Sequence, residues 1–278
     1  MANAVLERGL KQAEEERRDE GAAGWAAPAA TATAEALTPD TVSAWDGAPP
    51  VAGAGTMTMG GVASATGVLL VLLLAAGVVG WNLVEQPVPG QVEFPGWMLV
   101  PLLGAVGVAI VTAFKPPIAR FTAPIYALLQ GIVLGAISRV FEEEWDGIVL
   151  QAVALTVFVL AAMVFLYATR IIKVTDRMRR IVVGATLGLF VFYAVSLLLS
   201  IFGVQAPLIW DSGPFGILFS VAVCGLAAFN LALDFDLAER GVRAGLPKHM
   251  EWYCGFGLMV SLVWLYLEVL RLLGKLRS

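Results

Sequence analysis

The chain of 278 residues is 59% hydrophobic and only 14% charged, and its formal net charge is −4. A typical soluble domain has about 25% charged residues, so this composition excludes an ordinary soluble protein. The charge is unevenly divided: residues 1–60 hold 4 Lys+Arg against 9 Asp+Glu, and residues 61–278 hold 14 against 13. Because nucleic-acid binding needs basic residues clustered on a soluble face, no nucleic-acid partner is expected.

The first region, residues 1–55, is acidic and rich in alanine, threonine and proline. It has too few large apolar side chains to offset the entropy of ordering it, which predicts a disordered cytoplasmic tail. A short amphipathic helix over residues 2–20 is an alternative for its start. We expect no signal peptide there, because glutamates occupy positions 14–16 where a signal peptide would be apolar.

Residues 56–278 contain repeated apolar runs of roughly 20 residues, the length that a helix needs to cross about 30 Å of hydrocarbon. Unpaired backbone cannot lie in lipid, so each run is expected to be a complete helix. The prediction is an all-α membrane protein, a bundle of seven transmembrane helices in the lipid bilayer. The expected helices lie at about 62–84, 96–114, 120–141, 147–169, 181–203, 213–236 and 251–274.

Lysine and arginine in short loops predict the orientation, because cytoplasmic loops carry an excess of both. The loops after the second, fourth and sixth predicted helices hold Lys115, Arg120, Arg170, Lys173, Arg177, Arg179, Arg180, Arg240, Arg243 and Lys248. The alternate loops hold only Arg139. This pattern predicts a plasma-membrane protein with a cytoplasmic N-terminus and, after seven spans, an extracytoplasmic C-terminus. Basic residues at 271, 275 and 277 oppose it, and the alternative is a re-entrant last helix.

Polar residues within apolar runs are the candidate functional residues, because each is costly in lipid and usually faces the bundle interior. Asn230 and Asp234 are four apart and share one face near the end of the sixth predicted helix, whereas Asp236 points elsewhere. Ser261 and Glu268 are seven apart on the last predicted helix and lie on roughly the same face.

The functional interpretation is an ion- or proton-responsive site built on Asp234, with contributions from Asn230 and Glu268. A carboxyl group in a medium of low dielectric constant can change its charge near neutral pH. Carboxylate oxygens are also natural ligands of calcium, which makes calcium at Asp234 a possible occupant.

The structural interpretation of the same residues stays open. Asp234 and Asp236 would then be solvated at the cytoplasmic boundary and paired with an arginine of the following loop. Glu268 would lie near the opposite interface and pair with Arg271.

No enzyme signature is present: the sequence has no phosphate-binding glycine loop, no HExxH, no CxxC and no serine nucleophile elbow. The cysteines, Cys224 and Cys254, lie in apolar runs and are expected to be buried free thiols. We therefore expect neither catalytic residues nor a cofactor.

Five stretches of sequence carry a family resemblance. They are TMTMGGVASATG at the first predicted helix, PIYALLQGIVLGAIS in the third, RIVVGATLGLFVFYAVSLLLSIFG in the fifth, NLALDFDLAERGVRAG closing the sixth and VSLVWLYLEVLRLLG in the last. In this order and spacing they resemble the Bax-inhibitor/YccA family of transmembrane Bax-inhibitor-motif proteins, in its bacterial, actinobacterial-type branch, over about residues 56–278.

The resemblance implies six helices around a central seventh and, for some members, a pH-sensitive calcium leak through two aspartates. The first aspartate corresponds to Asp234, with Asp236 as the fallback. The second position falls on Ser261, so the paired carboxylates are missing, and Glu268 is a hypothetical substitute. Gln130 stands where relatives often have glutamate.

Two functions compete on this basis. The first is a passive leak for calcium or another cation, gated by protonation of Asp234. The second, also implied by the resemblance, is a non-conducting modulator of a membrane-bound AAA protease or another membrane partner, which the acidic tail could engage.

Overall fold

The computed structural model describes residues 55–84, 96–202 and 213–278, so the predicted tail and the helix at 2–20 lie outside the described residues. Within these ranges seven helices are long and apolar enough to cross a membrane, as predicted. In chain order they are α2 (Met59–Leu83), α3 (Leu99–Phe114, after the short 3-10 helix Gly96–Met98), α4 (Ala119–Glu144), α5 (Ile148–Ala168), α6 (Asp176–Ile201), α8 (Pro214–Arg243) and α9 (Met250–Arg277).

Two helices extend further into the basic loops than the apolar pattern indicates. α6 starts at Asp176 rather than near 181, because the Thr175 hydroxyl accepts a hydrogen bond from the Met178 N–H at 3.2 Å and caps the first turn. α8 continues to Arg243 rather than ending near 236. Its last turns carry charged pairs four residues apart, which stabilise a helix beyond its apolar part.

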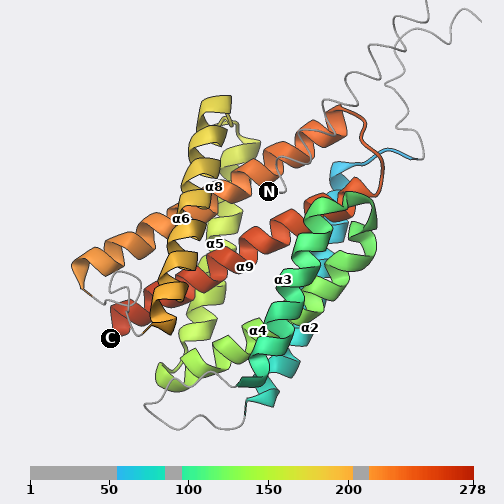
Figure 1. The fold of residues 1–278 in the computed structure, drawn as a ribbon. Coiled ribbons are helices and arrows are strands. Elements are labelled where there is room, and N and C mark those ends of the chain that lie inside the picture. Colours follow the sequence, from blue (N-terminus) through green and yellow to red (C-terminus); the bar gives the residue numbers. More distant parts are fainter. Residues whose placement is uncertain (1–54, 85–95, 203–212) are drawn as a thin grey trace, which may run out of the picture.

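The last helix, α9, lies at the centre of the bundle. It runs between α2, α3 and α4 on one side and α5, α6 and α8 on the other (Figure 1). Consecutive residues from Tyr253 to Phe256 are all buried, as are those from Glu268 to Leu270, and no residue of α9 from Met250 to Lys275 is exposed. The prediction of a central C-terminal helix is therefore confirmed. With 28 residues, α9 is also long enough to cross about 30 Å of hydrocarbon.

Small residues allow α2 and α4 to pack backbone against backbone. A Cβ atom added to Gly135 would overlap the carbonyl of Gly77, and one added to Gly131 would overlap the carbonyl of Leu73. Gly80 approaches the backbone of Ile132 in the same way. Small residues four apart are the usual means of bringing membrane helices this close, because lipid provides no hydrophobic force between them.

A buried carboxylate joins the start of the first helix to the start of the last. Glu251 of α9 accepts hydrogen bonds from the backbone N–H of Thr58 at 3.0 Å and from its hydroxyl at 3.1 Å. Thr58 is the N-cap of α2, and a carboxylate at a helix N-terminus is favoured by the helix dipole. Gly61 leaves room for this carboxyl group, since a Cβ there would overlap it.

The close contact between α2 and α4 predicts the effect of adding volume there. Gly135→Leu should lower the thermal unfolding midpoint, because overpacking costs about 1–3 kcal/mol even where only side chains must move. Gly107→Leu on α3 is the matched control, since a Cβ at Gly107 meets no atom within 4 Å. Unfolding of both variants in detergent measures this, and equal midpoints would contradict the packing described.

Candidate functional site

Asp234, on α8, points into the bundle toward the central helix. Its Oδ2 accepts a hydrogen bond from the Ser261 hydroxyl of α9 at 2.5 Å. Its Oδ1 faces Gly257, where an added Cβ atom would lie 3.6 Å from that oxygen. Both carboxyl oxygens therefore face α9, and the residue as a whole is half-buried. The structure thus joins Asp234 to Ser261, the residue at the position where the family resemblance implies a second aspartate.

No cation of the described residues forms an ion pair with Asp234. Tyr253 and Cys254, both buried on α9, lie near enough to interact with its charge. A carboxyl group with a single hydroxyl donor and no counter-ion, within a membrane-spanning helix, is costly when ionised. Asp234 is therefore the residue of the site that is best placed to exchange a proton or meet a cation.

Asp236 points away from this site and takes part in an ion-pair network. It accepts from Arg179 of α6 at 2.7 Å and from Arg240, one turn along α8, at 2.9 Å. Its negative charge is thus balanced by two guanidinium groups. This arrangement agrees with the structural interpretation of Asp236 as a paired residue near the end of the helix.

Asn230 lies on the side of α8 that meets α6. Its side-chain nitrogen donates to the Thr186 hydroxyl at 2.9 Å and to the carbonyl of Leu226, also at 2.9 Å. Although Asn230 and Asp234 are four residues apart, Asn230 bonds to α6 and Asp234 bonds to α9. The structure does not bring them into one cluster.

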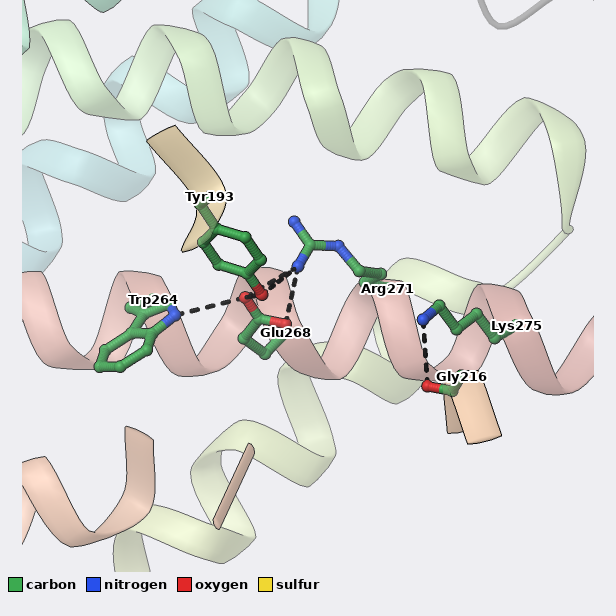
Figure 2. A network of polar contacts seen from close by, with 6 residues as sticks. All are labelled: Tyr193, Gly216, Trp264, Glu268, Arg271 and Lys275. Atoms are coloured by element: carbon green, nitrogen blue, oxygen red, sulfur yellow. Dashed lines mark hydrogen bonds and ion pairs between the residues drawn. The ribbon is translucent and has the colours of Figure 1, made fainter. Parts of the chain in front are cut away.

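Glu268 lies in a second polar network, toward the other end of α9 (Figure 2). Both of its oxygens accept from Arg271 at 2.9 Å, and Oε1 also accepts from the Tyr193 hydroxyl at 3.1 Å and from the Trp264 indole at 3.3 Å. The Arg271 guanidinium lies 5.4 Å from the centre of the Tyr193 ring. Glu268 is only 2% exposed. Its partners come from α6 and α9, so it does not join Asp234.

Lys275 continues the second network toward the end of the helix. Its ammonium donates to the backbone carbonyl of Gly216 on α8 at 3.1 Å, and the residue is buried (Figure 2). Glu268, Arg271 and Lys275 of the central helix thus each have a partner, either on a neighbouring helix or one turn along α9 itself.

Some of these contacts have no signal in the sequence. Arg179 lies in a stretch that the apolar pattern predicts as a loop. It belongs to α6 because the Thr175 cap starts this helix before Arg179, which the apolar pattern does not indicate. Glu251 and Thr58 are 193 residues apart, so local capping patterns cannot pair them. Tyr193 lies in an apolar run, where a tyrosine is ordinarily a packing residue.

The chemistry available at Asp234 is that of a weak cation or proton site. Calcium takes six to eight oxygen ligands, whereas Asp234 and Ser261 provide three side-chain oxygens. Among the described residues, no group of three or more His, Cys, Asp or Glu side chains could hold a metal ion. Any cation at this position would keep much of its water shell.

The comparisons with known proteins agree with this architecture. No curated protein and no solved structure matches the chain. The family model described as Bax inhibitor 1 like matches residues 3–278, and so it also includes the N-terminal region that the resemblance left outside. Because this match covers nearly the whole chain, the protein belongs to the Bax inhibitor 1 like family.

Proposed function

We propose that this protein is a passive cation leak of the plasma membrane, with calcium as its permeant ion, and that protonation of Asp234 controls the leak. The observation that carries the proposal is the direction of the Asp234 carboxyl group, which faces the central helix and has the Ser261 hydroxyl as its hydrogen-bond partner. The proposal includes no catalytic step and no cofactor.

The charge state of Asp234 links pH to conduction. When ionised, its carboxylate attracts a cation that passes between α8 and α9, and when protonated it no longer does. The small number of protein oxygens supports a leak, because a passing ion must bind weakly enough to leave. The leak should therefore fall as the pH falls through the titration of Asp234.

The orientation proposed is a cytoplasmic N-terminus and an extracytoplasmic C-terminus. It rests on the ten basic residues of alternate loops and on the complete length of α9. Arg271 and Lys275, which oppose it by charge count, form contacts within the bundle and therefore do not indicate a cytoplasmic end.

A phosphatase fused after Ser278 should be active outside the cell, and an inactive but expressed fusion would contradict this orientation.

Asp234→Asn should abolish the pH dependence of calcium flux in reconstituted liposomes, measured in a series from about pH 5 to 8. Because asparagine is neutral, the variant should conduct at every pH as the wild type does at the acidic end. The measurement is the rate of calcium entry across this pH series.

Glu268→Gln is the matched control for that experiment. It removes the charge that balances Arg271, which should cost about 3–5 kcal/mol of stability for a buried pair. The pH midpoint of the remaining flux should nevertheless stay at its wild-type value. A shift of that midpoint would indicate that Glu268, rather than Asp234, is the residue whose protonation controls the flux.

Ser261→Asp should replace the single pH midpoint of the flux by two steps, one below and one above the wild-type midpoint. The substitution places two carboxyl groups in direct contact, and two like charges at that separation cannot both ionise, so the pair retains a proton at a pH where a single carboxyl group has lost it. Ser261→Asn is the control, because asparagine has the shape of aspartate without its charge. An unchanged midpoint in Ser261→Asp would contradict a role for this contact.

The second candidate is a non-conducting modulator of a membrane-bound AAA protease or another membrane partner. The observation that favours it is the hydroxyl at Ser261, which leaves Asp234 without a second carboxylate to share its proton. Absence of wild-type calcium flux at every pH would favour this candidate. Affinity capture should then recover the partner with the full-length protein and not with a variant that lacks residues 1–55. Equal capture by both proteins would contradict binding through the tail.

A further inference from the structure

A groove opens between the first turns of α6 and the middle of α8. It has a volume of about 570 Å³, within the range of roughly 300–1,000 Å³ that is typical of small-molecule sites. Its floor and walls are apolar and include Val182 and Ala185 of α6 and Gly225 and Phe229 of α8. Arg177 lies at its rim.

The groove exists because α6 packs loosely on the bundle. α6 crosses α8 at an angle on the outside of the molecule (Figure 1). Small residues on both helices leave space between them: a Cβ atom added to Gly225 meets no other atom within 4 Å. One contact that joins the two helices beside the groove is the hydrogen bond from Asn230 to Thr186, the residues that follow Phe229 and Ala185 in the sequence.

Some of the basic side chains before and within α6 interact with other groups of the protein. Arg170 pairs with Glu239, Arg179 pairs with Asp236, and the Arg180 Nε donates to a backbone carbonyl of the same helix. Arg177 is exposed and pairs with no carboxylate of the described residues. A guanidinium group at the end of an apolar groove complements a molecule with one anionic end and one long apolar end.

We propose that this groove holds one acyl chain of an anionic phospholipid, whose phosphate is bound by Arg177. The chain would follow the apolar walls between α6 and α8 toward the interior of the membrane. Arginine binds phosphate through paired N–H groups, and basic residues at the ends of membrane helices favour anionic lipids by about a factor of five each. The site is independent of Asp234 and does not rest on the proposed leak.

The test is native mass spectrometry of the purified full-length protein with phosphatidylglycerol or phosphatidylcholine of the same acyl chains. The wild type should retain one phosphatidylglycerol molecule in preference to phosphatidylcholine. Arg177→Gln should reduce that preference about fivefold, because it removes one cation at the headgroup. Gly225→Leu should reduce retention of both lipids, because its side chain occupies the groove.

Two control variants separate the groove from the remaining surface. Lys115→Gln removes an exposed cation from another loop, and Gly107→Leu adds the same side chain on α3, where space is also open. Both should bind lipid as the wild type does. All four variants should keep the wild-type unfolding midpoint, which shows that any lost lipid reflects the site rather than the fold.

Each contrary outcome overturns the proposal in a defined way. If Arg177→Gln keeps the wild-type preference, the phosphate is not bound by this arginine. If Gly225→Leu retains lipid fully, the chain does not lie in the groove. If inorganic phosphate displaces the lipid at equal concentration, the site recognises free phosphate. A mass of two protein chains without lipid, reduced to one chain by Gly225→Leu, would assign the groove to a second copy.

Discussion

The whole architecture depends on one constraint: the other helices cover the last helix along most of its length, and that helix carries charged residues. Glu251, Glu268, Arg271 and Lys275 all lie on α9, and a membrane interior has no water to solvate them. Each meets a partner instead, at the cap of α2, within the network around Tyr193, or at the carbonyl of Gly216. These polar contacts join α9 to α2, α6 and α8, in addition to the apolar packing around it.

This constraint separates the polar residues of the bundle into two kinds. Asp236 and Glu268 have arginine partners, and their charges are balanced in place. Among the described residues, Asp234 has the hydroxyl of Ser261 as its hydrogen-bond partner and no arginine or lysine paired with it. The difference matters because a paired charge is compensated within the bundle, whereas a carboxylate without a counter-ion is costly in a spanning helix and can attract a cation. The proposed leak therefore assigns conduction to Asp234 and assembly to the others.

The sequence predicts the helices well because each apolar run has the length of the membrane, and it predicts α9 at the centre only through the family resemblance. It also groups Asn230 with Asp234, and Ser261 with Glu268, because spacing on a helix shows which residues share a face. Spacing does not show which neighbour each side chain meets. Asn230 bonds to α6, and Glu268 bonds to Tyr193 and Arg271, contacts that depend on how helices distant in sequence pack.

The most direct test of the proposed leak is whether calcium binding releases a proton from Asp234. A cation that binds a partly protonated carboxyl group displaces its proton, so calcium added to weakly buffered protein near neutral pH should acidify the solution. Wild-type protein in detergent should release at most about one proton per chain, and the amount should depend on the starting pH. Asp234→Asn should release none. Equal release from both proteins, or none from the wild type across the range in which the leak responds to pH, would contradict the assignment of Asp234 as the site where proton and cation compete.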